Sequence, residues 1–144
     1  MVSILLYNCN SWSATTVMLN KLDITHRKHL RHIRNIKWPT GGISNRALYK
    51  RCNVSPLSKR VENLRWRMFG HILRSDDTTP AYLSLRFAVE EANKFQGRLG
   101  RPHQNLYKTL INDLKARNID LNNTENLNEI RDIAKNRAKW KGMF

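Results

Sequence analysis

The sequence predicts an all-α protein, a small bundle of about five to six helices. Apolar residues recur every three or four positions in successive segments, which is the spacing of one helix face. Residues that favour the start of a helix precede several of these segments, and turns or polar loops separate them. With 144 residues, the chain is long enough for one modest domain or for two small helical subdomains that share a core.

The first expected helix covers about residues 16–36, and its other face carries arginines. The sequence WPTGG at 38–42 ends it, because proline and glycine interrupt helices. A short helix over 44–52 follows, which a serine caps and from which Ala47 and Leu48 point inward. The inward positions of the first helix are Leu19, Leu22, Leu30, Ile33 and Ile36.

The third expected helix, over about residues 55–75, has a glycine in its middle. It begins favourably, because proline is tolerated at the first helical position. Its buried stripe is expected to be Leu64, Met68 and Ile72. Gly70 costs about 1 kcal/mol relative to alanine in a helix, so we expect it to let another helix or backbone approach closely.

A basic connector is expected at residues 94–102. The turn SDDTTP and a helix over about 81–92 precede it, and two glycines, two arginines and a proline make it flexible. It is the one subdomain boundary that the sequence indicates. We therefore divide the chain into a basic helical region, 1–93, the connector, and a C-terminal helical tail, 103–144.

The tail is expected to contain two helices. Pro102 favours the start of the first, whose inward side chains are Leu106, Leu110 and Leu114. Thr124 is positioned to cap the second, which ends near Gly142. The inward side chains of this last helix are Leu127, Ile130, Ala134 and Trp140.

The charge is strongly positive and unevenly distributed. The formal net charge is +15, from 26 Lys and Arg against 11 Asp and Glu. Residues 1–75 carry 14 basic and 2 acidic side chains, and no acid lies between Asp23 and Glu62. A surface that is only solvated usually mixes both signs. The acid-free run therefore favours a polyanionic partner, of which nucleic acid is the commonest.

Membrane and redox features are few. Charge alone is also compatible with a membrane surface, but MVSILLY is too short to span a bilayer and lacks a charged leader region, so we expect no membrane partner. Cys9 and Cys52 match no zinc pattern and are expected to be reduced thiols. The expected location is nuclear or cytoplasmic.

Catalytic and metal-binding patterns are weak. His26, His29 and His32 lie on one basic helix without a carboxylate or cysteine partner, which favours surface groups or phosphate contacts over metal ligands. A hydrolytic triad could be imagined from His71, Ser75 and a nearby aspartate, but the sequence contains no nucleophile elbow. The adjacent acid pairs, 76–77 and 90–91, lack the hairpin strand that presents a polymerase acid pair. We expect no catalytic residue, no metal and no cofactor.

Two features admit alternative interpretations. The connector is either an arginine-bearing arm that enters a minor groove or a solvated hinge. The four tryptophans are core anchors or base-stacking platforms, and we expect at least three of them in the core. They are Trp12, Trp38, Trp66 and Trp140.

Several more specific motifs occur in order along the chain. They are LLYNCNSW at 5–12, HRKHLRHIRNIKWPTGGISNRALYKRCNVSPLS from His26, RWRMFGHILR at 65–74, TPA at 79–81, GRLGRP at 97–102 and IAKNRAKWK at 133–141. Their order resembles the C-terminal region of non-LTR (LINE-type) retrotransposon reverse transcriptases. The resemblance covers nearly the whole chain. Asn8 departs from the family's common glycine, and His103 from its usual basic residue.

The resemblance implies a helical thumb and post-thumb tail that grip the template and primer during target-primed reverse transcription. The palm, with its magnesium-binding aspartates, and the endonuclease would lie outside this chain. It therefore resembles a fragment of an RNA-directed DNA polymerase that is not an enzyme by itself. The expected partners are RNA, DNA or an RNA–DNA hybrid, and a palm-bearing chain in trans.

Two alternatives to a nucleic-acid-binding fragment are a decayed or domesticated helical remnant that acts, if at all, as a noncatalytic scaffold, and an enzyme completed in trans by the palm.

The expected contacts to nucleic acid fall into three groups. The middle group lies on the third expected helix, and in its alternative interpretation the arginines only solvate that helix. The three groups are Arg27, Lys28, Arg31, Arg34 and Lys37; Arg65, Arg67, His71 and Arg74; and Arg98 and Arg101.

Overall fold

A computed structural model describes residues 2–37, 42–91, 105–121 and 123–143. Every regular element in these ranges is a helix, which confirms the all-α prediction. There are eight α-helices and one 3-10 helix among the described residues, more than the five to six expected. They are α1 (Val2–Leu5), η1 (Cys9–Ser11), α2 (Thr16–Ile33), α3 (Asn45–Cys52), α4 (Leu57–Arg74), α5 (Pro80–Glu91), α6 (Leu106–Lys115), α7 (Thr124–Lys135) and α8 (Arg137–Gly142).

Asparagine follows several helices, and it ends α2 and α7 earlier than the sequence predicted. Asn35, Asn53 and Asn118 have positive φ angles near 50–58°, a conformation that asparagine tolerates and that commonly ends helices. Asn35 ends α2 before the proline and glycines that we expected to end it. Asn136 divides the expected last helix, because its side chain accepts a hydrogen bond from the Lys139 N–H and so caps α8.

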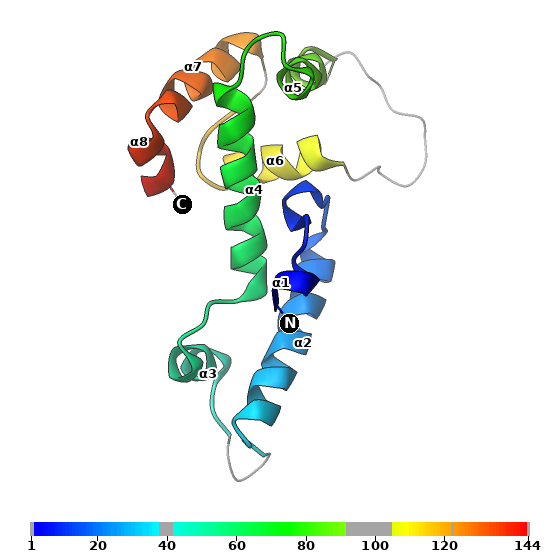
Figure 1. Ribbon diagram of the computed structural model, residues 1–144, viewed down its shortest axis with the longest axis vertical. Helices are drawn as coiled ribbons and strands as arrows, with labels where there is room; N and C mark the ends of the chain where they lie inside the picture. Colours follow the sequence, from blue (N-terminus) through cyan, green and yellow to red (C-terminus); the bar gives the residue numbers. More distant parts are fainter. Residues whose placement is uncertain (1, 38–41, 92–104, 122, 144) are drawn as a thin grey trace.

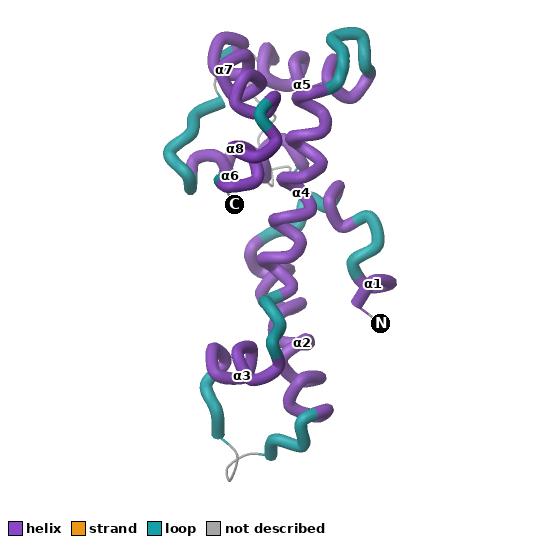
Figure 2. Tube along the Cα trace, turned by 60° about the vertical axis from the view of Figure 1, so that its left-hand side comes forward, coloured by secondary structure: helices purple, strands orange, loops and turns teal. Residues whose placement is uncertain are grey.

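Helix α4 runs through the middle of the molecule and joins two regions (Figure 1). Its N-terminal half packs against η1 and α2, and α7 and α5 contact its C-terminal half. Figure 2 shows α2 and α3 at one end of the long axis and α5 and α7 at the other. We call the first the α2–α3 region and the second the α5–α8 region.

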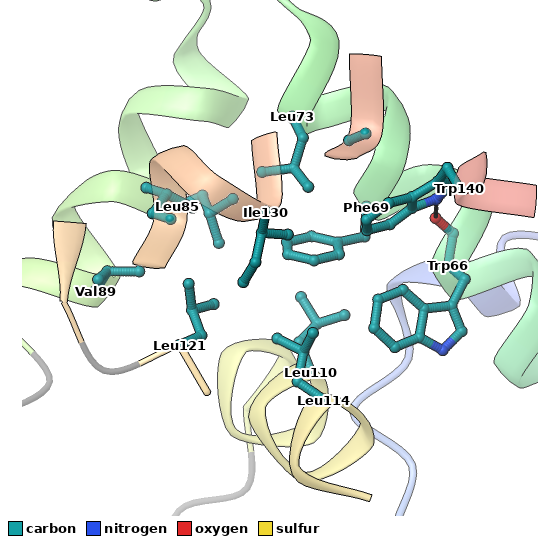
Figure 3. Packing of buried hydrophobic residues seen from close by; sticks show 12 residues of the cluster. Trp66, Phe69, Leu73, Leu85, Val89, Leu110, Leu114, Leu121, Ile130 and Trp140 are labelled. Atoms are coloured by element: carbon teal, nitrogen blue, oxygen red, sulfur yellow. Dashed lines mark hydrogen bonds between the residues drawn. The ribbon is translucent and has the colours of Figure 1, made fainter. Parts of the chain in front are cut away.

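The main core lies in the α5–α8 region (Figure 3). Trp66, Phe69 and Leu73 of α4 are almost completely buried there, against apolar side chains of α5, α6, α7 and α8. The predicted segments 1–93 and 103–144 therefore share this core, and the connector between them lies outside the described residues. The inward residues expected in the tail are confirmed, with Leu106 partly buried and Leu110, Leu114, Leu127, Ile130, Ala134 and Trp140 buried.

The expected buried stripe of α4 was wrong by one position. Leu64, Met68 and Ile72 are only partly buried, whereas Trp66 and Phe69 are at most 1% exposed. Trp66 and Phe69 are buried because they lie in one core with apolar side chains of α6, α7 and α8. Periodicity identifies a helix but not the direction from which two neighbours cover it.

Gly70 allows the close approach that the sequence predicted. The Trp140 side chain of α8 lies directly over it: a β-carbon built on Gly70 would be 2.4 Å from Trp140 Nε1 and 2.8 Å from Cε2. Trp140 Nε1 donates a hydrogen bond to the Trp66 carbonyl oxygen at 3.3 Å, drawn as a dashed line in Figure 3. The missing side chain therefore lets α8 dock on α4.

The α2–α3 region has a much smaller core. Leu6, Cys9, Leu57 and Val61 are buried there, and α2 contributes only partly buried leucines. Ile33, which we expected to point inward, is 76% exposed, because this end of α2 extends beyond α4. Among the described residues, α3 lies beside this end of α2, where Arg31 donates to Asn45. On α3, Leu48 is buried as expected, but Ala47 is exposed.

The one buried side chain of α2 is a carboxylate that caps α4. Asp23 accepts hydrogen bonds from the Ser58 backbone N–H at 3.0 Å and from its hydroxyl at 2.6 Å. Pro56, the N-cap residue of α4, has no side chain that can do this. Asp23 therefore supplies from another helix the acceptor and the negative charge that favour a helix N-terminus.

Candidate nucleic-acid interface

Eight cationic side chains gather on α2, on α3 and at the end of α2. Arg27, Arg31 and Arg34 are spaced by four and three residues, which places them on one face. Six of the eight cations are exposed, and Arg27 and Arg31 are half-buried. We call this set the α2–α3 basic surface: Arg27, Lys28, Arg31, Arg34, Lys37, Arg46, Lys50 and Arg51.

One hydrogen bond joins the two helices of this surface. Arg31 Nη2 donates to Asn45 Oδ1 at 2.8 Å, at the start of α3. Among the described residues, none of the eight cations forms an ion pair. The nearest acid in the sequence, Asp23, binds Ser58 instead. The positive charge of this surface is therefore not neutralised by the described part of the protein.

The three histidines of α2 have different surroundings. His26 is half-buried with its ring 5.9 Å from the Tyr49 ring, so it holds α2 against α3. Burial lowers the pKa of His26, although Asp23 acts in the opposite direction. His29 and His32 are exposed. The described residues contain no group of three or more side chains that could hold a metal ion.

Arg65 of the middle group is not available at the surface. Its side chain is 2% exposed, and its Nε lies 2.9 Å from Oδ2 of Asp113 on α6. Burial raises the pKa of the Asp113 carboxyl, and the Arg65 charge opposes this shift. The expectation that Arg65 contacts phosphate is therefore corrected: Arg65 pairs two helices in the interior.

The other members of the middle group remain accessible. Arg67 and His71 are exposed, and Arg74 is half-buried because its Nη1 donates to the Ala134 carbonyl oxygen at 3.1 Å. Arg67 and Arg74 line a pocket of about 340 Å³ between α4 and α8. Arg137 and Lys141 of α8 line it too. Sequence reasoning missed these two cations, because nothing local indicates that α8 faces Arg67.

Two more arginines are structural, and the sequence did not distinguish them. Arg131 of α7 donates to the Leu73 carbonyl oxygen at 3.0 Å and to that of Ser75 at 2.9 Å, so it caps the C-terminus of α4. Arg117 ion-pairs with Glu62, and its guanidinium lies 4.9 Å from the centre of the Trp66 ring. Both arginines therefore stabilise contacts between helices.

Other predicted features have different outcomes. Arg98 and Arg101 lie outside the described residues, as does Trp38. Trp66 and Trp140 are in the core as expected, and Trp12 is half-buried. Both cysteines are free thiols.

No helix in the described part of the chain is both long enough and apolar enough to span a membrane. Comparison with protein-family models, with curated proteins and with solved structures found no match. The resemblance to reverse transcriptases therefore depends on the sequence motifs alone.

Proposed function

We propose that this protein binds the phosphate backbone of nucleic acid through the α2–α3 basic surface. The observation that carries the proposal is that eight cations lie on two adjoining helices without an ion pair among the described residues. Uncompensated positive charge of this density attracts a polyanion and releases its condensed counterions on binding.

The proposed binding is largely independent of sequence. Arginine and lysine contacts to phosphate fix the position of a protein on nucleic acid but carry no base information. The mixture of arginines and lysines on α2 and α3 suits such contacts, because both bind phosphate and arginine does so with two donors.

The motif resemblance supports a more specific version of the proposal. A thumb and tail of a non-LTR reverse transcriptase grip the template and primer, so the favoured ligand is an RNA–DNA hybrid. We propose no chemistry for the chain by itself. One carboxylate of each adjacent acid pair is ion-paired, Asp77 with Arg131 and Glu90 with Arg86.

Fluorescence anisotropy with an RNA–DNA hybrid, duplex DNA and single-stranded RNA at several salt concentrations tests this function. We expect a steep loss of affinity with salt and tightest binding to the hybrid. A triple variant, Arg27→Ala with Arg31→Ala and Arg34→Ala, should weaken all three complexes and flatten their salt dependence. Unchanged affinity of this variant would contradict binding through the α2–α3 basic surface.

A second candidate is a noncatalytic scaffold that docks on a protein, such as a palm-bearing chain. The observation that favours it is the exposed apolar surface of α2, where Val17, Met18 and Ile24 are 45–63% exposed. A variant with Val17→Ser and Met18→Ser should then lose the protein partner but keep its affinity for the hybrid. Loss of hybrid affinity in this variant would contradict the separation of the two surfaces.

A further inference from the structure

We infer that the pocket between α4 and α8 binds a phosphate group of an unpaired nucleic-acid strand, as a second contact distant from the α2–α3 basic surface. This inference rests on the proposed function for the identity of the ligand. The pocket itself is a feature of the α5–α8 region. Among the described residues, its lining contains four cationic side chains and no carboxylate: Arg67 and Arg74 of α4, and Arg137 and Lys141 of α8.

The cations form two facing rows. Arg67 and Arg74 are seven residues apart, so they lie on one face of α4 and are separated by roughly 10 Å along its axis. Arg137 and Lys141 are four residues apart on one face of α8, separated by roughly 6 Å. Asn63, one turn before Arg67, adds a neutral hydrogen-bonding group to the α4 row.

The Gly70–Trp140 contact brings the two rows together. Gly70 lies between Arg67 and Arg74 on the same face of α4, and the Trp140 ring occupies the space where its side chain would be. Trp140 and Trp66 also line the pocket, and both are more than 90% buried. The pocket therefore has an apolar floor, and charges that lie against an apolar surface are screened less than charges in bulk water.

Little in the described structure neutralises this charge. Arg74 uses one N–H on the Ala134 carbonyl oxygen. Within the described ranges, Arg67, Arg137 and Lys141 form no ion pair. Four cations in one hollow repel each other, and a bound anion relieves that repulsion. Three of the four are arginines, whose forked donors match the oxygens of a phosphate.

The size of the pocket suits one nucleotide and excludes a duplex. Its volume of about 340 Å³ is at the lower end of the roughly 300–1,000 Å³ of small-molecule pockets. A phosphate with its sugar fits such a space, whereas the pocket is far smaller than a double helix. A free nucleotide or inorganic phosphate has the same chemistry, so the test includes both.

The test is a titration with a short oligothymidylate, followed by NMR through the Trp140 indole N–H. We expect a saturable shift of this signal. Lys141→Gln should weaken the complex about fivefold, and Arg137→Gln should act similarly. The matched control is Lys139→Gln on the same helix, because Lys139 is exposed and does not line the pocket. Equal effects of Lys141→Gln and Lys139→Gln would overturn the inference.

Two further measurements are needed. The first distinguishes a nucleic-acid strand from free phosphate, and the second distinguishes the pocket inference from the proposed function. The oligothymidylate should bind more tightly than thymidine monophosphate or inorganic phosphate, and equal affinities would overturn the assignment to a strand. The triple α2 variant should keep the Trp140 shift with the short probe. If the Trp140 signal does not move while the triple variant still weakens hybrid binding, the pocket inference fails and the proposed function stands.

Discussion

The structural arginines of the α5–α8 region and the cations of the α2–α3 basic surface use their positive charge in opposite ways. In the α5–α8 region, Arg65, Arg117 and Arg131 pair with carboxylates and with backbone carbonyls of neighbouring helices. The eight cations of the α2–α3 basic surface form no ion pair among the described residues. Net charge alone thus does not identify a binding surface. A binding surface is identified by cations that do not already pair with carboxylates or backbone carbonyls of the protein.

The two ends of α4 show the same contrast in a single helix. Asp23 from the α2–α3 region accepts hydrogen bonds at its N-terminus, and Arg131 from the α5–α8 region donates to carbonyls at its C-terminus. Each charge has the sign that the helix dipole favours. The charged groups that hold α4 are thus distinct from the exposed cations that we assign to phosphate.

The largest loss of stability is expected for Asp113→Ala. It leaves Arg65, a cation that is 2% exposed, without its counter-charge, which costs about 3 kcal/mol of the free energy of unfolding. Denaturant unfolding measures this loss. Asp120→Ala is the control, because Asp120 is exposed and forms no ion pair among the described residues. Equal losses in the two variants would contradict an interior role for Arg65.

Arg131→Met should cost about 2 kcal/mol, because it removes the donors to the Leu73 and Ser75 carbonyls together with the ion pair to Asp77. Arg34→Met, in the α2–α3 region, removes the same charge from an exposed position and should leave the unfolding free energy within about 0.5 kcal/mol. Thermal and denaturant unfolding of both variants measure the contrast. A similar loss in each would contradict the division of roles between the two regions.

Gly70→Ala should destabilise by roughly 1–2 kcal/mol, since the new methyl group collides with the Trp140 ring. This is the net loss, after the gain of about 1 kcal/mol that alanine brings to a helix. Gly142→Ala is the control, because a β-carbon there meets nothing within 4 Å. Denaturant unfolding compares the two. Stabilisation by Gly70→Ala would mean that α8 does not dock on this glycine.

Asp23→Ala should cost about 1 kcal/mol, the usual effect of losing an N-cap acceptor. The loss is smaller than that of Arg131→Met because fewer hydrogen bonds are removed. Asn20→Ala, at an exposed position one turn earlier on α2, should change nothing measurable in the same unfolding experiment. An equal loss in Asn20→Ala would contradict a specific role of Asp23 in capping α4, because alanine itself favours the helix.

Sequence reasoning succeeded where structure is local. The inward leucines of α6 and the apolar stripe of α7 follow from spacing alone, and the Ser44 cap was correctly placed. The cap expected at Thr124 was wrong by one residue, because the Asn123 side chain caps α7. Gly70 was interpreted correctly because an unfavourable residue in a helix needs a reason. Its partner, Trp140, could not be inferred, since the two residues are far apart in the chain.

It failed where the outcome depends on distant partners. Arg65 and Arg67 look equivalent in RWRMF, yet one binds Asp113 of α6 and the other is exposed. α2 ends early because Asn35 adopts a left-handed conformation. In the sequence, the proline and glycines a few residues later are the stronger indication of a helix end. The pocket was missed because it requires α8 to face α4.

Two equal removals of charge test directly whether nucleic acid binds at the α2–α3 basic surface. Lys28→Gln with Arg34→Gln changes the α2–α3 basic surface, and Lys108→Gln with Lys115→Gln changes exposed positions of α6. Affinity for duplex DNA is measured against salt concentration. We predict that the first pair lowers the salt slope by about two, at about 0.9 for each lost phosphate contact, and that the second pair leaves it unchanged. Equal changes in both would show that binding follows net charge and would contradict the account.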